Sequence, residues 1–319
     1  MGSPTRRRLE LDEVAALVDG SLGRVVAGEQ LDGGGFAAVW RVGLADGRTA
    51  VVKVAPPPEV RLLRYESGLH AAEAEYFRLV RRAAPDVPVP EVLGQGPDWL
   101  ATAWLPGTPL ARLRGHAEEP AVSRQLGAAV AALHRVTGER FGYPGRRTAP
   151  TWRAAFLGIV DDLLADAREL GVVLPAPPSR VAAVVEDAAG VLDAVRRPAL
   201  VHFDLWDGNV LADAGALTGL VDGERYLYGD PLVDFVSPAL FGRIEEVPGH
   251  PFVAGYGRAS TFDAVERRRL SLYRAHLYLI MNVEPVTRGT DGPGYADRRD
   301  RLATLLEAEL SDLARPLRG

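Results

Sequence analysis

Two short stretches of the chain place acidic and amide side chains directly beside apolar runs. The first, LVHFDLWDGN (200–209), contains His202, Asp204 and Asn209, and the second, GLVDGERYLYGDP (219–231), contains Asp222. Burying an unpaired polar group is costly, so packing alone does not account for these residues. Such a set can perform two kinds of chemistry: a carboxylate can accept a proton, and carboxylate and amide oxygens can bind a hard cation.

The segment between the two stretches predicts a β-hairpin that brings Asn209 and Asp222 together. NVL and LTGLVD are short apolar strands around a turn that contains Asp213 and Gly215. Directly opposed residues of an antiparallel pair have Cβ atoms about 5 Å apart, so one Mg²⁺ ion can bridge the amide and the carboxylate. Asp204 lies just upstream and stays free to act as the base that accepts or orients the proton of an attacking hydroxyl in phosphoryl transfer.

Residues 25–105 predict a β-rich unit with one main helix. Segment 25–54 has branched runs separated by Gly-rich and Asp-Gly turns, typical of a three-strand meander, and 66–84 has apolar residues at helical spacing. A connector rich in proline (87–96) leads to a strand at 98–110, which Pro106 and Gly107 interrupt. Because 319 residues exceed what one hydrophobic core usually serves, we expect two units, 1–105 and 106–319.

The second unit is predicted to be mainly helical. Helical spacing occurs in five segments: 119–136, 151–171, 178–197, 262–283 and 296–315. The one β-type island, residues 199–229, lies before the last two. The two chemically distinctive stretches therefore belong to a β island within a helical unit.

The pattern His202-x-Asp204-x-x-x-x-Asn209, followed by Asp222, resembles the catalytic loop and metal-binding Asp of the protein-kinase-like fold, in particular its aminoglycoside phosphotransferase and fructosamine kinase branch. HFDLWDGNVL and VDGERYLYGDPLVDF are similar to the HGDLxxGNxL and IDWExxxxGDPxxDL signatures of that branch. The resemblance covers most of the chain. It implies an α+β, bilobal fold with a small β-rich N-lobe and a larger, mainly helical C-lobe. It also implies transfer of the γ-phosphoryl group of ATP or GTP, with Mg²⁺, to a hydroxyl of a small molecule.

The resemblance extends to the N-lobe. Lys53 in AVVKVA matches the strand lysine that holds the α- and β-phosphates, and Glu73 matches its partner on the next helix. Glu75 competes for that role, and the motif spacing favours Glu73. Further nucleotide contacts are expected from the glycines of LDGGGFAAV and from the hinge in ATAWLPG, whose backbone meets adenine: Gly33, Gly34, Gly35, Ala103 and Leu105.

Some positions depart from the family pattern or have a structural alternative. Phe203 follows His202 where relatives carry Gly or Arg, and Gly223 follows Asp222 where relatives carry an aromatic residue. His202 is expected to hold its loop by hydrogen bonds, Asp230 to cap a helix and Asp234 to anchor the loop. Trp206, Asp207 and Glu224 are candidate contacts to the acceptor substrate. For Trp206 and Asp207 the alternative is a role in loop packing.

The identity of the acceptor stays open at the level of sequence. An aminoglycoside-type antibiotic, with a resistance role, suits the resemblance, whereas LHRVTGERFGYPG followed by Trp152 is similar to the fructosamine kinase side and suits a sugar amine or another metabolite. A non-catalytic nucleotide-binding pseudokinase is a further alternative. A peptide substrate is disfavoured because residues 223–241 leave little room for an activation loop.

Composition excludes several other classes. The chain has no cysteine, so disulfide frameworks and thiolate metal sites are excluded, and a net charge of -5 argues against a nucleic-acid surface. No apolar run approaches the roughly 18 residues of a membrane span, and the start shows no signal core. We expect a cytoplasmic monomer or homodimer without membrane or nucleic-acid partners, in which Arg6, Arg7 and Arg8 form a solvated tail.

Overall fold

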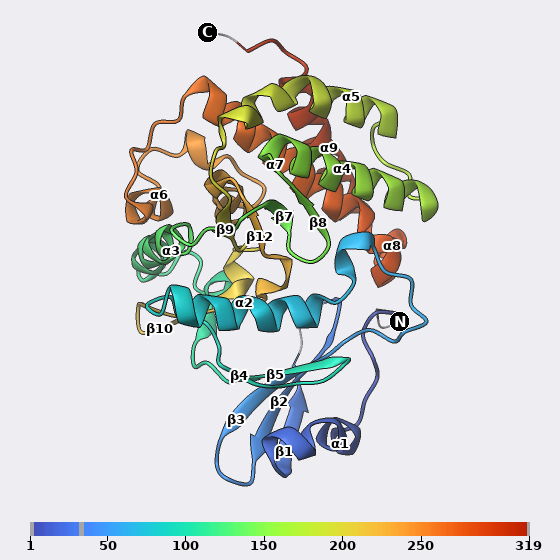
Figure 1. The fold of residues 1–319 in the computed structure, drawn as a ribbon, viewed down its shortest axis with the longest axis vertical. Helices are drawn as coiled ribbons and strands as arrows, with labels where there is room; N and C mark the ends of the chain where they lie inside the picture. The colour runs from blue at the N-terminus through green and yellow to red at the C-terminus, as the bar shows by residue number, and fades with distance from the viewer. Residues whose placement is uncertain (1–2, 32–34, 318–319) are drawn as a thin grey trace.

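The computed structural model describes residues 3–31 and 35–317, so Gly33 and Gly34 lie outside the described residues. Figure 1 shows a smaller β-rich lobe joined to a larger, mainly helical lobe, with one long helix, α2 (Leu69–Ala83), running between them. The expected bilobal α+β architecture is confirmed.

The N-lobe contains a five-stranded antiparallel sheet in the order β1-β2-β3-β5-β4. Its strands are β1 (Val25–Gln30), β2 (Ala38–Leu44), β3 (Thr49–Val54), β4 (Val92–Gln95) and β5 (Trp99–Ala103). Burial alternates along β2 and β3 because successive side chains of a strand point to opposite faces. Helix α1 (Leu11–Leu22), to which the sequence analysis assigned no element, covers one face with Val14 and Val18.

Helix α2 connects the two lobes through its buried face. It confirms the helix expected over 66–84 and follows a short 3₁₀ turn, η1 (Arg64–Glu66). Tyr76, Phe77 and Val80 are buried in the main core, which includes C-lobe residues, while Glu75 on the same helix is exposed. The helix also packs on η5 (Gly223–Arg225), directly after Asp222. Side chains on its inner face are thereby directed between the lobes.

The C-lobe is built from seven α-helices within the described residues, and all five predicted helical segments are confirmed. Segment 178–197 is helical only in its first half and continues as a 3₁₀ helix, Ala189–Ala194. Almost every residue of the C-terminal half of α7 is buried, because α4 and α9 both pack against it. The helices are α3 (Glu119–Leu133), α4 (Trp152–Glu169), α5 (Pro178–Ala188), α6 (Pro251–Tyr256), α7 (Ala264–Val283), α8 (Pro285–Arg288) and α9 (Ala296–Leu313).

Two small sheets in the C-lobe position the chemically distinctive loop. The predicted hairpin is confirmed as β10 (Val210–Asp213) and β11 (Ala216–Leu220), and β6 (Thr108–Pro109) adds a third strand. The second sheet has the order β8-β7-β12-β9, with β7 (Phe141–Tyr143), β8 (Arg147–Ala149), β9 (Ala199–Val201) and β12 (Leu227–Gly229). The expectation of a single β island was therefore wrong: the β7–β8 hairpin lies between α3 and α4.

The interpretation of Arg6 to Arg8 as a solvated tail was wrong for two of the three side chains. The Arg6 guanidinium donates to the carbonyl of Leu31 (2.7 Å), and Arg7 forms an ion pair with Asp98 (2.8 Å). Only Arg8 is exposed. The sequence does not predict these contacts, because Leu31 and Asp98 lie next to strand ends that are far from Arg6 and Arg7 along the chain.

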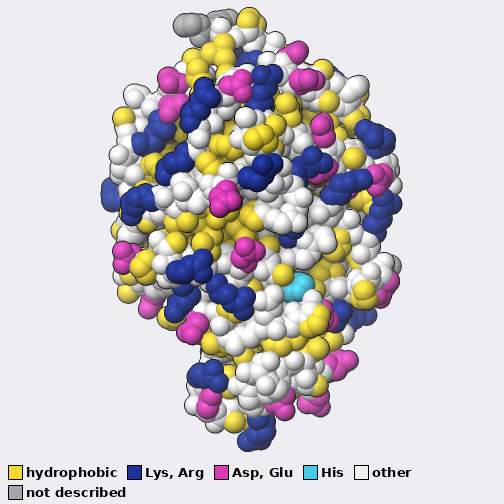
Figure 2. All heavy atoms as spheres, in the orientation of Figure 1, with side chains coloured by type: hydrophobic (Ala, Val, Ile, Leu, Met, Phe, Trp, Pro, Cys, Tyr) yellow, Lys and Arg dark blue, Asp and Glu magenta, His cyan; other side chains and the backbone are white. Residues whose placement is uncertain are grey.

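The face of the molecule in Figure 2 carries basic and acidic side chains interspersed among apolar ones, without a large area of one sign. In the part of the chain that the structure describes, helices are too short or too polar to traverse a bilayer.

Candidate active site

The loop that follows β9 is held by one buried carboxylate, that of Asp234. It accepts hydrogen bonds from the backbone amides of His202 (2.9 Å) and Phe203 (2.7 Å), and lies 3.1 Å from Nε2 of His134. Asp234 is fully buried in the turn η6 (Pro231–Phe235), which the side chain of Asp230 caps at Leu232. The expected roles of Asp234 as an anchor and Asp230 as a cap are confirmed.

Phe203 occupies a backbone conformation that most side chains avoid. Its φ is +76°, in the left-handed region that costs an L-residue other than glycine roughly 1–2 kcal/mol. Besides the bond to Asp234, the Ser237 hydroxyl donates to the Phe203 carbonyl (2.7 Å), and the Phe203 ring packs edge-on against His276 at 5.6 Å. These contacts explain how a buried aromatic residue is held in this backbone conformation.

Asn209 and Asp222 lie at the open end of the β10–β11 hairpin. Val210 and Leu220 form its first pair, and the amide of Val221 donates to the carbonyl of Asn209 (3.0 Å). Asp222 is itself in the left-handed conformation, with φ +59° and ψ +44°. The backbone bend turns its side chain out of the hairpin, where it meets the N-lobe.

Lys53 on β3 connects three remote segments of the chain. Its ammonium donates to both carboxylate oxygens of Glu73 on α2, at 2.7 and 2.8 Å, and to Oδ1 of Asp222. Glu73 is buried whereas its competitor Glu75 is exposed on the opposite side of α2. The structure therefore pairs Lys53 with Glu73 and brings both to the mouth of the C-lobe hairpin.

Carboxylates outnumber ammonium groups in this cluster. Burial alone would lower the pKa of Lys53, but the carboxylates of Asp222, Glu73 and Glu224 outweigh it and raise this pKa. Burial, helped by repulsion from Glu224 and Asp222, raises the pKa of Glu73, and Lys53 opposes the shift by favouring the ionised carboxylate. Burial also opposes ionisation of Asp222, yet Lys53 holds its pKa below the usual range. A surplus of negative charge remains, and an additional cation would be stabilised there.

Asp204 lies half-buried beside the same cluster. Burial raises the pKa of its carboxyl, and Asp222 adds to this effect while Arg225 opposes it. Its backbone amide donates to Nδ1 of the buried His202 (3.3 Å), and its carbonyl accepts from Nδ2 of Asn209 (2.9 Å). His202 thus holds the loop by hydrogen bonding, as expected. These bonds use only the backbone of Asp204, so its carboxylate remains available to a ligand.

Asn209 and Asp222 fit a Mg²⁺ site with few protein ligands. Because Nδ2 of Asn209 bonds to the Asp204 carbonyl, its Oδ1 remains an available acceptor, and the Asp222 side chain is 42% exposed. Mg²⁺ typically retains several waters and takes one or two carboxylates plus substrate phosphates. Among the described residues no group of three or more His, Cys, Asp or Glu side chains is arranged to hold a metal.

The remaining expected nucleotide contacts lie along the N-lobe. The carbonyl of Gly35 accepts hydrogen bonds from the hydroxyls of Ser3 (2.7 Å) and Thr5 (2.6 Å), which tie the chain start to the end of the glycine segment. The amide of Ala103 donates to the carbonyl of Glu91 (2.8 Å), so only the Ala103 carbonyl remains for a ligand at this residue. Leu105 is half-buried just beyond the end of β5.

The three candidate substrate residues make different contacts. Trp206 is 41% exposed, and its ring covers Gly208 so closely that a Cβ there would clash with it. The Asp207 carboxylate is buried and paired with Arg114 (2.5 Å). Glu224 instead lines a cavity of about 110 Å³ shared with Lys53 and Glu73. Glu224 thus lies beside the Lys53–Glu73 pair.

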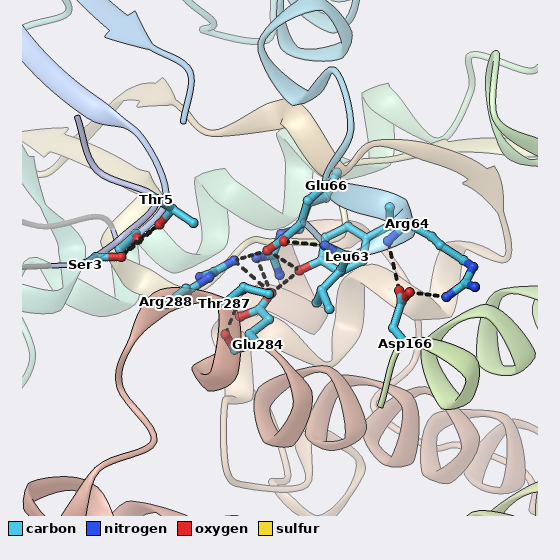
Figure 3. A network of polar contacts seen from close by, with 12 residues as sticks. Ser3, Thr5, Leu63, Arg64, Glu66, Asp166, Glu284, Thr287 and Arg288 are labelled. Carbon is cyan, nitrogen blue, oxygen red and sulfur yellow. Dashed lines mark hydrogen bonds and ion pairs between the residues drawn. The ribbon is translucent and has the colours of Figure 1, made fainter. Parts of the chain in front are cut away.

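A buried network of four charged residues lies beside the site and was not predicted from the sequence. Arg225 pairs with Glu284 (2.6 Å), and Arg288 pairs with both Glu66 (3.0 Å) and Glu284 (3.1 Å). Figure 3 shows how Arg288 and Glu284 on the α8 side meet Glu66 of η1. The network fixes η5, the turn that directly follows Asp222. The spacing of Glu284 and Arg288 is compatible with a helical pair, but nothing in the sequence indicates that the pair is buried.

The sequence model of the phosphotransferase enzyme family matches residues 28–273. No match was found among curated protein sequences.

Solved structures with the same fold span nearly the whole chain. A candidate fructosamine-3-kinase from Thermobifida fusca is 26% identical and aligns with a TM-score of 0.68 over 95% of this chain and 100% of its own. An aminoglycoside phosphotransferase, solved with AMP-PNP and hygromycin B, is 19% identical, with a TM-score of 0.64 over 95% and 99%. A macrolide 2′-phosphotransferase from Brachybacterium faecium is 19% identical, with a TM-score of 0.56 over 97% and 99%.

Proposed function

The chain belongs to the phosphotransferase enzyme family, and on this premise we propose that it transfers the γ-phosphoryl group of ATP or GTP to a hydroxyl group of a small molecule. The contacts of Lys53 carry the proposal. One ammonium joins Glu73 of the N-lobe helix to Asp222 of the C-lobe hairpin. A structural lysine needs only one partner, whereas a lysine between two carboxylates at a lobe junction suits the binding of a polyphosphate.

Lys53 and Glu73 are proposed to act as a unit. Both oxygens of Glu73 bind the ammonium, which fixes the direction in which Lys53 points. When the nucleotide binds, Lys53 exchanges its bond to Asp222 for one to the α- and β-phosphates, while Glu73 keeps it in place. Asp222 is then released to face a cation.

Asn209 and Asp222 are the proposed ligands of Mg²⁺. When bound, the ion neutralises phosphate charge and orients the transferable group. The chain contributes an amide oxygen from the start of the hairpin and a carboxylate from its end, held by the Val210–Leu220 pair between them. The surplus negative charge of the cluster supports this assignment.

Asp204 is the proposed base. A raised pKa brings a carboxylate closer to the range in which it can accept a proton from an attacking hydroxyl during transfer. The bonds to His202 and Asn209 hold its backbone on both sides, so the carboxylate is positioned relative to the metal ligands.

The adenine or guanine ring is proposed to lie against the hinge, with the Ala103 carbonyl and the Leu105 amide as its backbone contacts. The amide of Ala103 is excluded from this role by its bond to Glu91. Gly33, Gly34 and Gly35 are proposed to cover the phosphates, and the anchored carbonyl of Gly35 fixes one end of that segment.

Replacement of the base tests the function directly. Asp204→Asn is expected to bind Mg²⁺·ATP as the wild type does and to lower phosphoryl transfer, measured by ADP release, by on the order of a thousandfold. Asp213→Asn, an exposed aspartate on the same hairpin, is the matched control and should be fully active. Equal activity of Asp204→Asn and the wild type would remove Asp204 from the mechanism. Nucleotide binding without turnover by the wild type would support the pseudokinase alternative instead.

A further inference from the structure

A larger cavity lies in the C-lobe, on the far side of η1 from Lys53. It has a volume of about 580 Å³ and is bounded by η1, the β7–β8 hairpin, α4 and α7. Its lining combines aromatic and aliphatic surface with six titratable groups besides its two tyrosines: Arg64, Arg146, Arg147, Asp162, Asp166 and His276. This volume lies within the range that small-molecule sites commonly have.

Both acidic side chains of the cavity are already neutralised. Asp162 binds Arg147 through both carboxylate oxygens, one at 2.6 Å. Asp166 accepts from the guanidinium of Arg64, a pair seen in Figure 3, and from the Arg64 backbone amide at 2.8 Å. A polycationic ligand would therefore have to break an existing ion pair to find a carboxylate here.

Arg146 is the exception among the three arginines. It is half-buried, and its guanidinium donates to the backbone carbonyl of Tyr65 (2.5 Å) but forms no ion pair with a carboxylate of the described residues. Three arginines and two aspartates leave one net positive charge on the lining. His276 does not add to it near neutral pH, because burial lowers its pKa to about 4. A partly desolvated guanidinium without a counterion is a suitable partner for an anion.

The cavity backs onto the proposed catalytic loop through two aromatic contacts. The ring of His276 packs on Phe203, the residue before Asp204, at 5.6 Å. The guanidinium of Arg225, three residues after Asp222, lies 5.3 Å from the ring of Tyr65. Because His276 and Tyr65 also line the cavity, the cavity adjoins the segments that carry Asp204 and Asp222.

We propose that this cavity binds the acceptor of the phosphoryl transfer and that the acceptor carries a carboxylate or phosphate group that pairs with Arg146. This inference rests on the proposed function. It replaces the polycationic aminoglycoside with an acidic hydroxyl compound as the expected substrate class.

Acceptors with a common carbon skeleton and different charged groups test the proposal. Wild-type enzyme is assayed for ADP release with glucose, glucuronate, glucose 6-phosphate and glucosamine, and with glycerol, glycerate, glycerol 3-phosphate and 2-amino-1,3-propanediol. In at least one set, one of the two acids should have a kcat/KM about tenfold or more above that of the neutral and amine members, as expected for a charge-assisted hydrogen bond. Preference for an amine or a neutral member overturns the proposal but leaves phosphotransfer intact, and absence of transfer to every acid also overturns it. Failure to bind Mg²⁺·ATP, measured separately, would instead reject the proposed function.

Variants then locate the charge. Arg146→Gln should raise KM for the acidic acceptor about tenfold while KM for ATP and transfer to the neutral counterpart stay unchanged, and Arg146→Lys should recover part of the loss. Arg135→Gln, which removes an exposed arginine upstream of β7 that does not line the cavity, is the matched control. An equal effect of Arg146→Gln on acidic and neutral acceptors would indicate a structural role and contradict the proposal.

Discussion

Protonation of His276 should destabilise the protein at mildly acidic pH. Burial, and to a smaller extent Arg225, lowers the pKa of this histidine from 6.5 to about 4. A histidine with a depressed pKa in the folded protein contributes its stability above pH 6.5, and this contribution is lost as the pH falls toward 4, because the unfolded chain binds the proton more readily.

The magnitude follows from the two pKa values. One pKa unit corresponds to about 1.4 kcal/mol, so at pH 5 the histidine should cost about 2 kcal/mol of unfolding free energy, against almost nothing at pH 7.5. His276→Phe removes the titrating group and retains an aromatic ring between Phe156 and Phe203, each of which packs 5.6 Å from the imidazole.

Urea unfolding followed by tryptophan fluorescence at pH 7.5 and 5.0 measures the effect in both proteins. The wild type should lose about 2 kcal/mol more than His276→Phe between these two pH values. Taking the difference between the proteins cancels the other titrating groups. Equal losses in both would refute the assignment of a depressed pKa to His276.

Three further substitutions follow from the site geometry. Asp222→Asn should raise the Mg²⁺ concentration for half-maximal ADP release by on the order of tenfold, because a carboxylate ligand becomes neutral; an unchanged Mg²⁺ titration would exclude Asp222 as a ligand. Glu73→Gln should lower kcat/KM for ATP by on the order of tenfold, since Lys53 loses its charged partner, whereas Glu75→Gln on the exposed side of α2 should have no effect. In urea unfolding, Phe203→Gly should have a free energy of unfolding about 1 kcal/mol higher than Phe203→Ala, because only glycine is unstrained at φ +76°. A lower value for Phe203→Gly would contradict that reason.

Local sequence patterns predicted the hairpin and the main helices, because spacing along one element determines which side chains share a face, and the family resemblance added the pairing of Lys53 with Glu73. Glu73 and Glu75 are two positions apart, so a helix must direct them to different sides, and the structure buries Glu73. The two apolar runs around Asp213 and Gly215 likewise predicted the short hairpin whose open end carries Asn209 and Asp222.

Contacts between remote segments could not be predicted in the same way. Arg225 pairs with Glu284, which is 59 residues away in the chain, and Arg64 pairs with Asp166, which is 102 residues away. Neither pairing produces a periodic pattern in the sequence. The β7–β8 hairpin was missed because its strands have only three residues each, too few to show alternation. As a result, the cavity that these segments line could be recognised only in three dimensions.

The hydroxyls of Ser3 and Thr5 have a practical consequence for producing the protein. Both bind the carbonyl at Gly35, so a purification handle added before them would join the chain close to one end of the proposed phosphate-covering segment. A handle at the carboxyl end, beyond α9, avoids that region, and kinetic constants for ATP measured with each arrangement would reveal how strongly the first few residues govern nucleotide affinity.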